Sequence, residues 1–88
     1  MKKEIKSLKK QVSFIVDFEN ANTLDEINKR YNEIEAEIKR GINQMYASPM
    51  WSIKEADEIK GYAYDLLEIR FNETRTRVVK AEREKWIF

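Results

Sequence analysis

The chain has 88 residues, and 38% of them are charged although the net charge is only +1. A chain of this length forms one small domain with a modest core, so a deep active-site pocket is not expected. Histidine and cysteine are absent, which excludes the usual zinc ligand sets and nucleophiles that depend on either residue. Two glycines are too few for a glycine-rich phosphate loop. We therefore expect a protein that is not an enzyme and uses no metal or cofactor.

The apolar residues are spread along the chain and never form the run of about 18 residues that indicates a transmembrane helix. No disulfide can support the fold, which favours a reducing compartment. We expect a soluble, cytoplasmic protein that does not contact a membrane.

The first segment carries two competing patterns. Helical spacing joins Ile5, Leu8, Val12 and Ile15. Strand-like alternation joins Val12, Phe14, Val16 and Phe18. No other segment offers a strand with which this one could pair, so a helix is favoured over residues 3–19. Residues 20–22 are expected to form a turn.

The middle segment predicts a helix over residues 24–46. Its apolar residues recur at helical spacing: Leu24, Ile27, Tyr31, Ile34, Ile38 and Met45. Thr23 and Glu26 form a capping box that places the first helical residue at Leu24. Gly41 lies on the strict seven-residue stripe, but the drift of a straight helix favours Ile42 as the buried residue. The helix should end before Ser48 and Pro49.

The last segment predicts a long helix over residues 53–85, which Ser52 and Glu55 start with a second capping box. One face carries Ala56, Ile59, Ala63, Leu67, Phe71, Thr74, Val78 and Ala81. Tyr62, Leu66 and Ile69 widen this face in the middle, as expected for a helix that packs against two others.

Short connections make neighbouring helices antiparallel. The sequence therefore predicts one all-α domain over residues 1–88, a small antiparallel three-helix bundle with an elongated C-terminal helix. The end of that helix should overhang the bundle. Charge is divided along it, because residues 53–68 carry a net charge of −3 and residues 69–88 a net charge of +3.

Large apolar residues gather at the second turn and at the end of the chain, where contact residues are often found. These candidate protein-binding residues are Tyr46, Met50, Trp51, Trp86 and Phe88. They favour a non-enzymatic protein-binding module, a small adaptor or inhibitor that presents helical surfaces to a larger protein partner. The alternative for these residues is burial in the core.

Basic residues of the last helix form a second candidate surface: Arg70, Arg75, Arg77, Lys80 and Arg83. They predict a charged rim that steers the protein partner or, as an alternative function, a nucleic-acid-binding ladder. Neighbouring Glu73, Glu82 and Glu84 could instead form local ion pairs with them. A third function is a self-assembling structural subunit, a homo-oligomer in which the apolar band of the last helix pairs with another copy.

Overall fold

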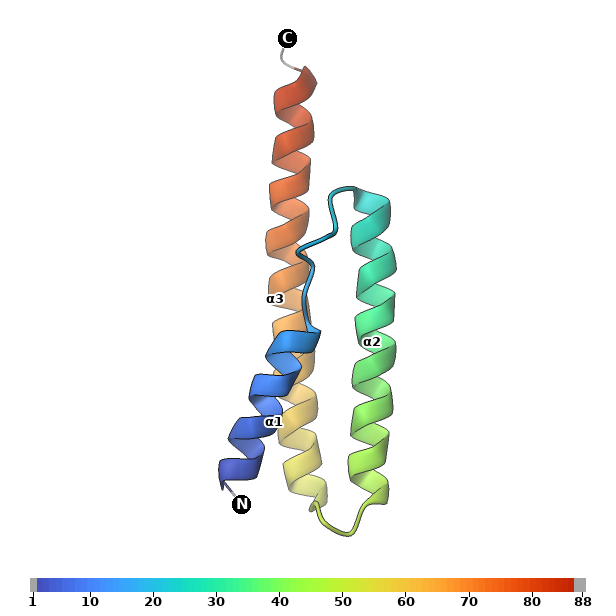
Figure 1. The fold of residues 1–88 in the computed structure, drawn as a ribbon, viewed down its shortest axis with the longest axis vertical. Helices are drawn as coiled ribbons and strands as arrows, with labels where there is room; N and C mark the ends of the chain where they lie inside the picture. Colours follow the sequence, from blue (N-terminus) through green and yellow to red (C-terminus); the bar gives the residue numbers. More distant parts are fainter. Residues whose placement is uncertain (1, 87–88) are drawn as a thin grey trace.

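The computed structural model describes residues 2–86, and the side chains of residues 4–85. It contains three helices, α1 (Lys2–Ile15), α2 (Leu24–Ala47) and α3 (Ile53–Trp86). α3 runs along the whole molecule, α1 lies beside its first half, and α2 lies on the other side (Figure 1). α2 is antiparallel to α3, and α1 is parallel to it. The fold is therefore the predicted all-α antiparallel three-helix bundle, and the described residues contain no strand.

The molecule is elongated. Its extents are 59 × 20 × 16 Å, and its radius of gyration is 15.8 Å. A compact domain of this length would have a radius of gyration of about 12 Å. The difference comes from α3, which has 34 residues and continues well past the start of α2 (Figure 1). The predicted overhang is therefore present.

Side-chain caps determine where α2 and α3 begin. At the start of α3, the Ser52 hydroxyl accepts from the Glu55 N–H at 3.1 Å, and the Glu55 carboxylate accepts from the Ser52 N–H at 2.9 Å. At the start of α2, the Thr23 hydroxyl accepts from the Glu26 N–H at 3.1 Å. The Glu26 carboxylate reaches the N–H of Asn22 rather than that of Thr23. Both helices begin at the residue that the capping boxes predict.

The core lies along the facing sides of α2 and α3. α2 buries Ile27, Ile34, Ile38, Ile42 and Met45. α3 buries Ala56, Ile59, Ala63, Leu67 and Val78. The buried stripe of α2 includes Ile42 and leaves Gly41 exposed, as the drift of the helix predicts. Four positions predicted on the apolar helix faces are exposed instead, namely Ile15 (37%), Leu24 (39%), Ile69 (54%) and Ala81.

The end of α1 differs from the prediction. The helix stops at Ile15 rather than at residue 19, and an extended linker over residues 16–23 leads to α2. In a helix, Val16 and Phe18 would point about 200° apart, so only one of them could face the core. The extended linker buries both, together with Ala21, while Phe14 is 72% exposed. The alternating pattern therefore prevails beyond Ile15, without forming a strand.

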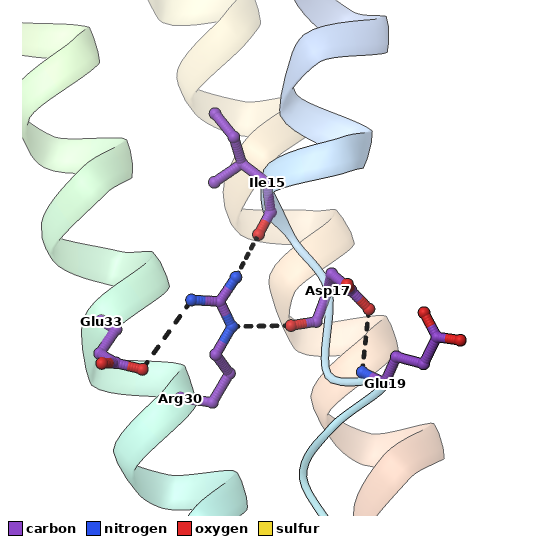
Figure 2. Close-up of polar contacts among 5 residues, drawn as sticks. All are labelled: Ile15, Asp17, Glu19, Arg30 and Glu33. Carbon is purple, nitrogen blue, oxygen red and sulfur yellow. Dashed lines mark hydrogen bonds and ion pairs between the residues drawn. The ribbon is translucent and has the colours of Figure 1, made fainter.

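A guanidinium group of α2 binds the linker on one side. Figure 2 shows Arg30 between Glu33 of α2 and the linker backbone. Its Nε donates to the Asp17 carbonyl at 2.8 Å, and its Nη2 donates to the Ile15 carbonyl at 3.2 Å. The Asp17 carboxylate in turn accepts from the Glu19 N–H at 2.9 Å. These hydrogen bonds fix the point where α1 ends and the linker begins.

Two guanidinium groups of α3 bind the same segment on the other side. Arg70 donates to the carbonyls of Ser13 and Val16, the latter at 2.6 Å. Arg77, two turns further along α3, donates to the carbonyl of Ala21 at 3.2 Å. α1 has no basic residue in its last turn, so these arginines satisfy carbonyl groups that its own sequence leaves without donors. We call Arg30, Arg70 and Arg77 the arginine clamp.

Aromatic rings anchor the linker between α2 and α3. The ring centroids of Phe18 and Phe71 are 6.2 Å apart, and those of Tyr31 and Phe71 are 4.9 Å apart in an edge-to-face arrangement. Such pairs contribute about 0.5–1.5 kcal/mol each beyond their burial. The Tyr31 hydroxyl donates to the Glu68 carboxylate at 3.0 Å and connects α2 to α3. The linker is therefore an integral part of the core.

The arginine clamp leads to a first prediction. Arg70→Met keeps most of the apolar stem but removes both hydrogen bonds, so the free energy of unfolding should fall by about 2–3 kcal/mol. Arg75→Met on the same helix is the matched control, because Arg75 is exposed and has no hydrogen bond or ion pair within the described part of the chain. It should change stability by less than about 0.5 kcal/mol. Urea unfolding followed by circular dichroism measures both, and equal losses would contradict the assignment.

Candidate functional site

A groove opens between α1 and α2. Each of these helices packs along α3, but they make only marginal contact with each other. The groove between them has a volume of about 410 Å³. Its lining is Leu8, Gln11, Val12 and Ile15 from α1; Glu37, Ile38, Gly41, Ile42, Gln44 and Met45 from α2; Ser48 and Trp51 from the turn; and Ile59 and Ala63 from α3. We call this site the α1–α2 groove.

The α1–α2 groove is almost uncharged. Of its fourteen lining residues only Glu37 carries a charge, although 38% of the whole chain is charged. The remaining polar side chains, Gln11, Gln44 and Ser48, are neutral. A lining of this kind suits an apolar ligand surface with a few hydrogen-bonding groups at its edges.

Gly41 lies on the α2 wall of the groove. It has no positive φ, and a Cβ atom added to it would meet nothing within 4 Å. Neither backbone conformation nor packing inside the chain therefore requires glycine at this position. Glycine in a helix costs about 1 kcal/mol relative to alanine, and what it provides here is close access to the α2 backbone.

The structure separates the candidate residues at the second turn. Trp51 is half-buried, packs against the core and lines the groove. Met50 is 74% exposed and lies outside the groove lining. Tyr46 is exposed as well, and its hydroxyl donates to the Asp57 carboxylate on α3. Only Trp51 combines a core contact with an open face toward the groove.

The candidates at the end of the chain are only partly described. Trp86 is the last residue of α3, and its side chain lies outside the described part of the structure. Phe88 lies outside the described residues altogether.

The five basic candidates fall into two groups. Arg70 and Arg77 belong to the arginine clamp and donate to backbone carbonyls of the linker and of the end of α1. Arg75, Lys80 and Arg83 lie on one exposed side of α3, around a shallow depression. Among the described side chains no ion pair joins two residues of α3, whereas Arg30–Glu33 and Lys39–Glu35 are ion pairs within α2.

The described residues offer neither a metal-binding cluster nor a membrane-spanning stretch. No group of three or more carboxylate, histidine or cysteine side chains in this part of the chain is arranged to hold a metal ion. None of the helices, as far as they are described, contains a stretch long and apolar enough to cross a membrane.

Comparison with models of protein families, with characterised proteins and with solved structures finds no significant match.

The contact between Tyr46 and Asp57 leads to a second prediction. The hydrogen bond to the carboxylate, with some desolvation, raises the pKa of Tyr46 above its ordinary value of 10.0. A raised pKa in the folded state stabilises the fold below pH 10, and this stabilisation is lost as the pH rises through the folded-state pKa. Tyr46→Phe should therefore lose less stability above pH 10 than the unmodified protein does. Urea unfolding on either side of pH 10 measures this, and identical pH dependence in the two proteins would refute it.

Proposed function

We propose that this protein is a non-enzymatic protein-binding module, a small adaptor or inhibitor that binds a helix of a larger protein partner in the α1–α2 groove. The observation that carries the proposal is the open groove with one charged residue among fourteen. In water, covering an apolar surface of this kind with a partner lowers the free energy of the complex and so favours binding.

The shape of the groove favours a helix as its occupant. The rim on α1 runs from Leu8 to Ile15 and the rim on α2 from Glu37 to Met45, which correspond to about 10 and 12 Å of helix. About two turns of a partner helix match these lengths. A helix satisfies its own backbone hydrogen bonds, whereas an extended segment would leave them unpaired against walls made of side chains. A helix in this position would complete a four-helix bundle.

The candidate contact residues take different roles in this proposal. Trp51 is the anchor at the turn end of the groove, with Met50 and Tyr46 as exposed neighbours in the chain. Trp86 and Phe88 are proposed as a separate contact at the end of α3. The exposed basic residues of α3, which are Arg75, Lys80 and Arg83, would act as a charged rim that accelerates association.

A third prediction follows from the two glycines of the chain. Gly41→Leu should close the groove, and it should raise the free energy of unfolding by up to about 1 kcal/mol because glycine is a poor helix former. Gly61→Leu is the matched control, since Gly61 is also an exposed helical glycine with open space around it but does not line the groove. Unmodified protein and Gly61→Leu should both capture a nuclease-resistant protein from lysate of the source cell, and Gly41→Leu should not.

Photo-cross-linking then tests whether the captured protein occupies the groove. A photoreactive phenylalanine at Gln44, on the rim, should cross-link to that protein, whereas the same group at Thr76 on α3 should not. If all three proteins capture the same species, or if only nuclease-sensitive species bind, the groove does not have the proposed function.

A further inference from the structure

The side of α3 that faces away from the core carries a regular stripe. Its members are spaced three or four residues apart, as neighbours on one helix face are: Glu58, Gly61, Asp65, Ile69, Asn72, Thr76, Val79 and Arg83. All are exposed except Val79, which is half-buried. None belongs to the buried set of α3, which lies on the opposite side of the helix. We call this set the outer stripe.

Charge along the outer stripe is divided by sign. Glu58 and Asp65 lie in its first half, where the exposed Lys54 continues the same face one turn before Glu58, and Arg83 lies in its second half with Arg75 beside the stripe. Among the described residues the two acids and the two arginines make no hydrogen bond or ion pair. A ligand of one charge would be attracted by one half and repelled by the other. A second α3 in antiparallel orientation places these two acids near the two arginines of the facing helix.

We propose that two copies of this chain associate through their outer stripes, antiparallel, around a two-fold axis near residue 70. In this register every member of the stripe faces another member. Glu58 faces Arg83 of the second copy, Gly61 faces Val79, Asp65 faces Thr76 with Arg75 beside it, and Ile69 faces Asn72. The interface is isologous, so each of these pairs occurs twice.

Steric features of the stripe agree with this register. A Cβ atom added to Gly61 would meet nothing within 4 Å, so the chain itself does not fill the space in front of it. A valine from the facing helix fits such a position, because the missing side chain lets two helices approach closely. Ile69, 54% exposed, lies with Asn72 beside the two-fold axis and would be covered by the facing helix. The interface thus buries one of the two large aliphatic side chains that α3 leaves exposed, the other being Ile53 at the start of the helix.

This inference does not involve the α1–α2 groove, although it places Arg75 and Arg83 of the proposed charged rim in the dimer interface. α3 contributes Ile59 and Ala63 to the floor of the α1–α2 groove, on the side opposite the outer stripe. A dimer through the stripe leaves both grooves open, so either proposal can fail while the other holds. The acids within the stripe also argue against a nucleic acid as its partner, since phosphates would be repelled by Glu58 and Asp65.

Complementary charge reversal tests the proposal. The unmodified protein should have a mass near twice 10.6 kDa by light scattering at high concentration, and it should dissociate as salt is added. An all-basic stripe (Glu58→Lys with Asp65→Lys) and an all-acidic stripe (Arg75→Glu with Arg83→Glu) should each weaken the dimer on the order of 30-fold, because four attractive pairs become repulsive. An equimolar mixture of the two should restore a dimer that contains one copy of each.

Two controls separate the interface from general charge and stability effects. Lys29→Glu with Arg40→Glu on α2 changes the net charge as much as the all-acidic stripe does and should leave the dimer intact. Gly61→Leu should abolish the dimer while stabilising the helix, whereas Gly41→Leu should not affect the dimer. A monomer at every concentration, a dimer that survives both reversals, or a mixture that stays monomeric would overturn the proposal. So would a monomer that binds labelled DNA through Arg75 and Arg83.

Discussion

The position of α1 depends on how the backbone carbonyls at its end find hydrogen-bond donors. A helix end leaves carbonyl groups unpaired, and the extended linker after α1 has no strand partner that could supply N–H groups. Three guanidinium groups from the two longer helices fill this role. Arg30 binds the segment from α2, and Arg70 and Arg77 bind it from α3. Arginine suits this task better than lysine, because its planar fork can donate to two carbonyls at once.

The sequence predicts those helix boundaries that depend on local contacts, and it misses the one that depends on the arginine clamp. α2 and α3 begin where local chemistry places them, since each capping box is complete within a few residues. The end of α1 has no such local signal, and two periodic patterns overlap at Val12. Contacts that are distant in sequence decide between them, notably Arg70 with Val16 and Phe71 with Phe18. Arg70 and Arg77 lie seven residues apart beside the apolar face of α3, and this spacing was a sequence signal for a structural role. The other basic residues of the same helix, such as Arg75 and Arg83, favoured a surface interpretation instead.

The groove was less predictable than the helices that form it. The sequence drew attention to Trp51, which does line the groove, and to Gly41, which the apolar stripe of α2 made conspicuous. It did not indicate that α1 and α2 would stay apart above α3, because helix separation is a property of the assembled bundle. Leu8 and Ile42 come from different helices and become groove residues only through that separation. Residue type alone could not distinguish them from ordinary core positions.

The helix lengths explain why α1 and α2 leave so much of the surface of α3 uncovered. α1, α2 and α3 have 14, 24 and 34 residues, so the two shorter helices cannot enclose the longest one. The two glycines lie on the surfaces that remain, one in the α1–α2 groove and one on the outer stripe. Each costs about 1 kcal/mol, which is a sizeable part of the 5–15 kcal/mol that typically stabilises a domain. A Cβ atom added to either glycine would meet nothing within 4 Å of the described chain, so both positions leave the helix backbone open to close approach.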